Sequence, residues 1–149
     1  MLEATHREFR VKRIKKDTGM KKLKGIDGKL DDAWSLLVKL EAGNKCEVCG
    51  TTKTLNSHHI FSRSNRSVRW DESNGVCLCV AHHTFSSSFS AHKTPTEFTF
   101  WLVKEYGEVF MDELRIKANS TKKWTTYEKE ELLEALKEKI RKHEINLSN

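Results

Sequence analysis

The chain has 149 residues, of which 37% are hydrophobic and 32% charged, and its formal net charge at neutral pH is +6. This length favours one domain with a modest core, and the composition excludes a wholly disordered chain. No apolar run approaches the roughly 20 residues that a membrane span needs, and the charged N-terminus lacks a secretory signal. We therefore expect a cytoplasmic protein that does not engage a membrane.

Residues 1–30 form a basic arm. They hold ten Lys or Arg and four Asp or Glu, so their surplus accounts for the whole net charge. A basic segment on a neutral body is typical of proteins that bind a polyanion, nucleic acid first. A solvated tail that only aids solubility has the same composition, so the arm supports DNA binding without deciding it.

After the arm, the sequence predicts a short helix over 31–43, with acidic residues in its first turn and Gly43 as its stop. The middle of the chain then alternates polar turns with short apolar runs. In order, these are a tight turn NKCEVCGTT (44–52), a strand TLNSHHI (54–60), a loop FSRSNRS (61–67), a second strand NGVCLC (74–79) and a helix from Val80.

Three further helices are predicted in the C-terminal third. The motif TPTE at 94–97 has the pattern of a capping box with proline at the first helical position, and this helix runs to about Tyr106. A second helix spans 108–118. The motif TTYE at 125–128 repeats the capping signal and opens a longer helix that reaches about His143. Their apolar stripes assign all three helices to packing.

The cysteine spacing predicts a metal site. Cys46-x-x-Cys49 matches the two-ligand turn of a structural zinc site. Of the candidates about thirty residues later, Cys79-x-x-His82 has the better geometry, because residues three apart lie on one face of a helix. Cys77 with Cys79 is the rival pair, so a four-cysteine site stays open, and Cys77 is otherwise a small apolar strand residue. A zinc with four protein ligands has no open position, which predicts a structural role needed for folding.

The two adjacent histidine pairs then acquire separate roles. If His82 binds zinc, His83 lies about 100° around the helix and can meet His58 and His59. Strand, loop, strand and helix in this order, with Asn74 at the entry to the second strand, resemble the HNH endonuclease family, the ββα-metal nucleases. The resemblance is carried by about forty residues: Cys46-x-x-Cys49, LNSHHI, ESNGVCLC and Cys79-x-x-His82-His83. More narrowly, the run SVRWDESNGVCLCVAHHTFSSSFSAHKTP (67–95) resembles small phage-encoded members that contain zinc.

The resemblance implies an α+β fold, with a ββα-metal core stapled by a structural zinc knuckle and flanked by several helices. It implies that His59 is the general base, that Asn74 holds the loop around it, and that His58 and His83 hold one catalytic divalent cation (Mg²⁺, Mn²⁺ or Ni²⁺). Many members have aspartate in place of His58, so the preference here moves from Mg²⁺ towards Mn²⁺, Ni²⁺ or Zn²⁺. Zinc-containing members commonly have cysteine in place of His82, which leaves open which of the two helix histidines binds which metal.

The activity that the resemblance implies is metal-dependent hydrolysis of DNA phosphodiester bonds, by nicking or double-strand cleavage, to give 3′-hydroxyl and 5′-phosphate ends. The expected organisation is a basic arm (1–30), a zinc-stapled nuclease core (31–93) and a helical extension packed on the core (94–149). In the loop between the strands, Arg63, Arg66 and Arg69 are candidates for phosphate contacts, or are solvated or paired with Asp71 or Glu72.

Other readings stay open. One is a zinc-stapled DNA-binding module without catalysis, which needs no second metal. Another is a structure-selective nuclease acting on branched recombination intermediates, with phage recombination or packaging proteins as partners. A homodimer, with one active site in each subunit, could cut both strands of a duplex. His92 is interpreted as a local packing or capping residue rather than a ligand.

Overall fold

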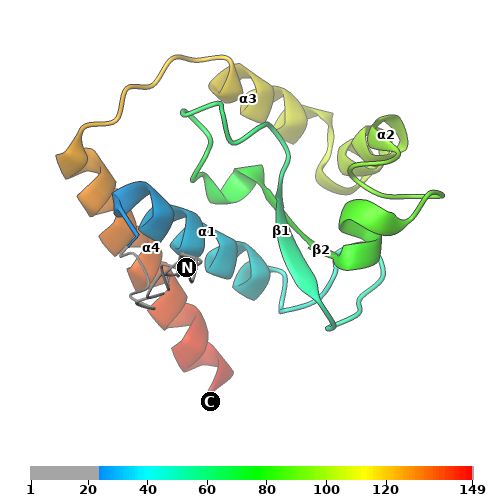
Figure 1. The fold of residues 1–149 in the computed structure, drawn as a ribbon, viewed down its shortest axis with the longest axis horizontal. Coiled ribbons are helices and arrows are strands. Elements are labelled where there is room, and N and C mark those ends of the chain that lie inside the picture. Colours follow the sequence, from blue (N-terminus) through cyan, green and yellow to red (C-terminus); the bar gives the residue numbers. More distant parts are fainter. Residues whose placement is uncertain (1–23, 149) are drawn as a thin grey trace, which may run out of the picture.

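The computed structural model describes residues 24–148, so most of the basic arm and its expected contact with DNA lie outside the described residues. The elements follow the predicted order (Figure 1). They are α1 (Ile26–Glu41), β1 (Leu55–His59), η1 (Glu72–Asn74), β2 (Gly75–Cys79), η2 (Ala81–Phe85), α2 (Pro95–Tyr106), α3 (Glu108–Ala118) and α4 (Thr126–Leu147). The described chain is thus an α+β fold, with one small antiparallel sheet among helices.

Helix α1 begins at Ile26, five residues earlier than the acidic pair at 31–32 suggested. The reason is a stripe of apolar side chains that starts upstream of that pair, with Leu30, Trp34 and Leu37 buried on one face. The acidic residues therefore lie inside the helix instead of at its N-terminus. The helix ends at Glu41, and Gly43 follows in the left-handed region with φ of 64°.

Strands β1 and β2 pair antiparallel, with His58 opposite Val76 and His59 opposite Gly75. Consecutive strand residues point to opposite faces of a sheet, so the two histidines face different layers. Helix α1 covers the face of His59, and Ser57 on that face donates a hydrogen bond to the Ser35 carbonyl at 2.7 Å. Helix α2 covers the other face, where Phe98 contacts His58 with ring centroids 5.4 Å apart.

The hydrophobic core is divided between the two sides of the sheet. One cluster joins α1, α4 and Cys77, and in Figure 1 α4 lies alongside α1. The second cluster joins the other face of β2 to α2 and to Cys46 and Cys79. A small third cluster packs Val68 of the β1–β2 loop against α3. The hairpin is therefore held between two helical layers, which fixes the direction of each strand side chain.

The predicted positions of the three C-terminal helices are confirmed, but only one of the two predicted capping boxes is present. The capping box at Thr125 and Glu128 is present, and α4 runs to Leu147, four residues past the expected end. The box predicted at Thr94 is absent, because the Thr94 hydroxyl instead exchanges hydrogen bonds with the Ser90 backbone at 2.9 and 3.0 Å. Over the described residues, no helix combines the length and the apolar character that crossing a bilayer requires.

Candidate metal centres

The Cys46–Cys49 turn has the local geometry of a metal-binding knuckle. The Gly50 amide donates to the Cys46 carbonyl at 2.7 Å, and Gly50 adopts φ of 73°, which favours glycine. Glu47 fastens this turn to strand β2, because its amide donates to the Cys77 carbonyl at 2.9 Å and its carboxylate accepts from the Cys77 amide at 2.6 Å. The knuckle is thereby held beside the middle of β2.

Cys46, Cys49, Cys79 and His82 converge into one cluster whose ligand atoms all lie within 4.8 Å of one another. The Cys49 and Cys79 sulfurs are 3.9 Å apart, and His82 Nδ1 lies 3.3 Å from Cys79 Sγ and 3.7 Å from Cys46 Sγ. Zn–S bonds of about 2.3 Å and a Zn–N bond of about 2.0–2.1 Å in a tetrahedron require separations of about 3.6–3.8 Å. The cluster can hold a metal ion and fits the geometry of structural zinc.

The pKa values of the thiols differ between Cys46 and Cys77. Burial alone would raise the pKa of the Cys46 thiol, but hydrogen bonds from the backbone at Cys79, Cys49 and Val48 outweigh it and lower the pKa from 9.0 to about 6. Burial raises the pKa of Cys77 to about 11.

Metals bind the thiolate, and burial disfavours that form in Cys77. A backbone hydrogen bond from Thr51 lowers the pKa of Cys49, but burial and the neighbouring thiols raise it overall, although Cys49 lies in the cluster. Cys77 lies in the α1–α4 core, away from the cluster. Position, and not pKa, therefore separates Cys77 from the four ligands.

The turn after β2 directs its two histidines to different places. Residues 81–85 form a single π-helical turn, closed by the Ser86 amide donating to the Ala81 carbonyl at 2.8 Å. His82 faces the sulfurs, and His83 faces away from them. The returning chain bonds to both, because the Ala91 amide donates to the His82 carbonyl at 2.8 Å and the His92 amide to the His83 carbonyl at 3.2 Å.

This return forms a second cluster from His58, His83 and His92, again with ligand atoms within 4.8 Å. The Nε2 atoms of His83 and His92 are 3.3 Å apart, which fits two nitrogens that are each about 2.0–2.1 Å from one ion. His83 Nδ1 lies 3.0 Å from the Thr84 hydroxyl, a contact that orients the ring and leaves Nε2 for the cluster. The interpretation of His92 as a packing or capping residue missed this position.

Burial favours the neutral form of two imidazoles in this cluster, those of His58 and His83. It lowers the pKa of His58 to about 4, and the neighbouring histidines add to the effect. Burial and the proximity of His92 likewise lower the pKa of His83. A neutral imidazole is the form that binds a metal. The donor set of three nitrogens, one of them on the exposed residue His92, therefore suits a borderline-soft divalent cation and leaves room for further ligands.

His59 lies beside this cluster but on the other face of the sheet. Its Nε2 lies 2.8 Å from the Arg69 carbonyl oxygen, and a carbonyl only accepts, so Nε2 carries the proton. In the neutral ring Nδ1 is then the unprotonated nitrogen. Burial lowers the pKa of His59, although the hydrogen bond that it donates to the Arg69 carbonyl opposes this shift. His59 is thus suited to accept a proton at Nδ1.

Asn74 closes the loop that follows His59. Its side chain is fully buried and uses every hydrogen of its amide group. Oδ1 accepts from the Phe61 amide at 2.7 Å, and Nδ2 donates to the carbonyls of Phe61 and Val68 at 2.9 and 3.1 Å. The donors and acceptors fix the orientation of the amide, and these three bonds hold both ends of the 61–74 loop. The predicted contact of Asn74 with backbone near His59 is present.

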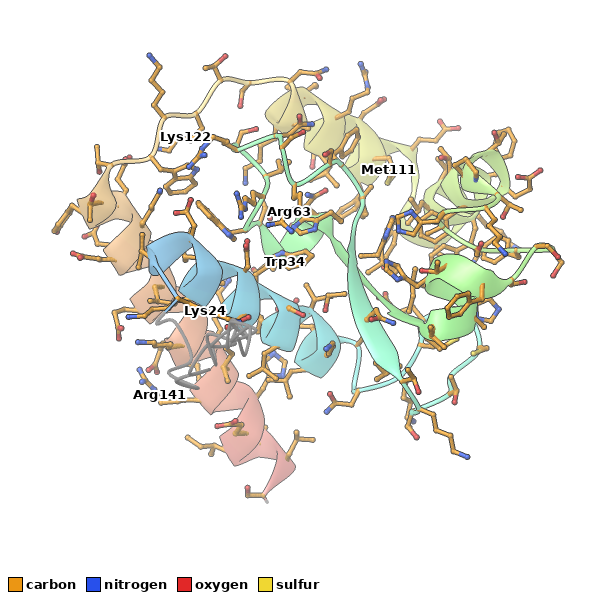
Figure 2. All side chains as sticks on the ribbon, viewed as in Figure 1. Lys24, Trp34, Arg63, Met111, Lys122 and Arg141 are labelled. Carbon is orange, nitrogen blue, oxygen red and sulfur yellow. The ribbon has the colours of Figure 1, made fainter. Side chains whose placement is uncertain are left out.

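The loop arginines pair with α1, and not with the two acidic residues considered from the sequence. Arg69 donates Nε and Nη2 to the Asp31 carboxylate at 3.0 and 2.7 Å, and only 16% of its side chain is exposed. Arg63 reaches Asp31 at 3.2 Å with 64% of its side chain exposed, and Arg66 lies 3.6 Å from Asp27. Figure 2 shows Arg63 and Trp34 in the region between α1 and the hairpin.

Asp71 and Glu72 pair instead with Lys117 and Lys139. Of the three arginines, Arg63 is the one whose guanidinium is most available to a further anion, whereas Arg69 is engaged in a largely buried ion pair.

Comparison with known proteins identifies no relative, since no protein-family model, no curated protein and no solved structure matches the chain. The chemistry of the site must therefore be argued from its own residues.

Proposed function

We propose that the chain is a metal-dependent DNA endonuclease of the HNH type, with a ββα-metal core formed by β1, β2 and η2. The observation that carries this proposal is the convergence of His58, His83 and His92 into one set of nitrogen donors, with His59 as the next residue of β1 on the opposite face of the sheet. A histidine suited to accept a proton and a set of three imidazoles lie at the same end of β1. A binding module would need the cysteine-rich cluster but neither of these features.

In the proposed reaction, a phosphodiester lies across the end of β1 between the two sites. His59 Nδ1 accepts a proton from the attacking water, the water oxygen bonds to phosphorus, and the bond from phosphorus to the 3′ oxygen breaks. The leaving 3′ oxygen takes a proton from a solvent water, so the products are a 3′-hydroxyl and a 5′-phosphate. Asn74 keeps the loop closed, so the Arg69 carbonyl continues to hold Nε2 and Nδ1 stays available.

His58 and His83 would hold the catalytic divalent cation, and His92 is the third nitrogen donor of that set. A divalent ion bound there would stabilise negative charge on the phosphate and on the leaving 3′ oxygen. Three imidazoles favour Mn²⁺, Ni²⁺ or Zn²⁺ over Mg²⁺. Cys46, Cys49, Cys79 and His82 would hold the structural zinc, and Arg63 is the loop arginine best exposed for a phosphate.

The test is cleavage of supercoiled plasmid with added Mg²⁺, Mn²⁺ or Ni²⁺, with the wild type compared with His59→Ala. We expect cleavage that requires added metal and falls by about 10²–10⁴-fold when the base is removed. The matched control is His143→Ala, which removes a histidine of α4 and should leave cleavage intact. Product ends should be ligatable, as 3′-hydroxyl and 5′-phosphate ends are.

A different result would favour the zinc-stapled DNA-binding module. In that case neither wild type nor His59→Ala would cleave the plasmid with any metal. Both proteins would still bind it and slow its migration in a gel mobility assay. If the plasmid is cleaved, four-way junctions and flapped duplexes separate a general nuclease from one that selects branched DNA.

A further inference from the structure

Helix α1 contacts His59 in two ways, although it lies outside the strand–strand–helix unit. Trp34 and Asp31 of α1 are three residues apart and therefore lie on the same face of the helix. Trp34 contacts the imidazole directly, and Asp31 holds Arg69, whose carbonyl accepts a hydrogen bond from the imidazole N–H. Both contacts converge on a side chain that the strand alone would leave free to rotate.

Trp34 supplies the direct contact. Its ring lies flat on the imidazole of His59, with centroids 3.8 Å apart and planes inclined by 10°. Trp34 is itself fixed, because only 2% of it is exposed and its Nε1 donates to the Asp71 carbonyl at 2.8 Å. A stacked ring of this kind restricts rotation of the imidazole about χ2, which decides where Nδ1 points.

Asp31 supplies the indirect contact. Its carboxylate accepts from Nε and Nη2 of Arg69 and from Nε1 of Trp70, the last at 2.8 Å. Burial alone would raise the pKa of Asp31, but these donors and the arginine charges lower it. The carboxylate thereby fixes the 69–70 backbone, and with it the Arg69 carbonyl that accepts from His59 Nε2.

The residue opposite His59 in the sheet lets α1 come this close. Gly75 pairs with His59, and a Cβ at Gly75 would lie 2.3 Å from Cγ2 of Val38 and 3.0 Å from Cζ2 of Trp34. No side chain fits between β2 and α1 at this point. The absence of a side chain there allows the tryptophan to reach the imidazole on the neighbouring strand.

We propose that Trp34 and Asp31 are positioning residues for His59, which hold its Nε2–H tautomer and the direction of its Nδ1. This inference rests on the proposed function, since His59 is the base only if the chain is a nuclease. A tryptophan that served only to fill the core would stabilise the fold without affecting the turnover of folded enzyme. A positioning residue affects turnover even when folding and DNA binding are preserved.

The test compares Trp34→Leu, Trp34→Phe and Asp31→Asn with wild type, under saturating Mn²⁺ and at a temperature where each variant is folded. We expect kcat to fall about 10- to 100-fold in Trp34→Leu while KM changes less than about twofold. Trp34→Phe keeps an aromatic face on the imidazole and should recover kcat to within about threefold of wild type. Asp31→Asn should lower kcat about tenfold.

A second readout does not depend on cleavage. Long-range ¹H–¹⁵N NMR of the zinc-loaded protein reports which ring nitrogen of His59 carries the proton. We expect the Nε2–H tautomer in wild type and Trp34→Phe, and a mixture of tautomers in Trp34→Leu and Asp31→Asn. The matched control is Leu133→Ala, which opens the same core from α4 and should leave both the tautomer and kcat unchanged.

The outcomes separate this inference from the function on which it rests. A folded Trp34→Leu with wild-type kcat, a loss confined to KM, or an equal loss in Leu133→Ala would overturn the positioning role alone. An Nδ1–H tautomer in wild type would overturn it as well. Wild type that cleaves no DNA with any metal would overturn the proposed function. If Trp34→Leu does not fold, Asp31→Asn and the NMR spectra decide the result.

Discussion

The two clusters on either side of η2 use neighbouring histidines for different chemistry. His82 joins three cysteines in a set that already supplies four ligands, and its partners Cys46 and Cys79 are buried. His83 joins two other histidines in a set of three, one of which is exposed. The first set can complete a tetrahedron around one ion and links two distant segments. The second set supplies three nitrogens, so an ion held there would keep positions for further ligands.

This contrast shows how one turn can serve two sites. Neighbouring residues of a helical turn point in clearly different directions, so two adjacent histidines do not easily share one small site but can each complete a different one. The amides of Ala91 and His92 bond to the carbonyls of these same residues. Loss of either cluster should therefore have distinct effects, and the variants below separate them.

The largest effect is expected from removing a ligand of the cysteine-rich cluster. Cys49→Ser should remove tightly bound zinc and cooperative thermal unfolding, because structural zinc contributes about 10–16 kcal/mol of binding free energy. Cys77→Ala is the matched control. It should retain one equivalent of zinc, because Cys77 packs in the core beside α1. Metal analysis and calorimetry check both, and equal zinc loss in the two variants would contradict the assignment.

The next effect concerns the loop that holds His59. Asn74→Ala removes three hydrogen bonds and leaves buried backbone groups without partners, so the free energy of unfolding should fall by about 2–4 kcal/mol. The tightly bound zinc should remain, since Asn74 does not contact the cysteine cluster. Denaturant unfolding with metal analysis checks this, and loss of zinc together with stability would show that the two regions are not separable.

A smaller effect distinguishes His82 from His83. His83→Ala should retain the tight zinc and weaken binding of a second divalent ion by at least about tenfold, with a similar change in His92→Ala. His82→Ala should lose the tightly bound zinc and retain binding of the second divalent ion. Titration with Ni²⁺ or Co²⁺, followed by calorimetry and absorption, measures both sites. Zinc lost from His83→Ala but retained in His82→Ala would exchange the two assignments.

The smallest effect tests how the knuckle is fastened. The Tyr106 hydroxyl donates to the Glu47 carboxylate, and Tyr106→Phe should cost about 1 kcal/mol of unfolding free energy. Burial and the Glu47 bond raise the pKa of Tyr106 above its ordinary 10.0. The Tyr106–Glu47 hydrogen bond therefore contributes fully to the free energy of unfolding below pH 10, and this contribution declines as the pH rises further. Tyr127→Phe, on an exposed tyrosine of α4, is the control and should have no measurable effect.

The sequence by itself determined the features that depend on short spacings. Cys46-x-x-Cys49 and Cys79-x-x-His82 each bring two ligands together within one turn, and the structure joins these two pairs. The capping box at 125–128 and the helix at 108–118 are likewise local patterns. Such features follow from backbone geometry over a few residues, which no distant contact has to supply.

Only the tertiary structure decided the features that depend on how separate segments meet. His92 reaches His83 because the chain folds back after η2, and its polar surroundings in SAHKT gave no sign of that path. The start of α1, the pairing of Asp31 with the loop arginines and the stacking of Trp34 on His59 all depend on how α1 docks against the hairpin. That docking is permitted by the bare backbone at Gly75, a property that spacing along the sequence does not encode.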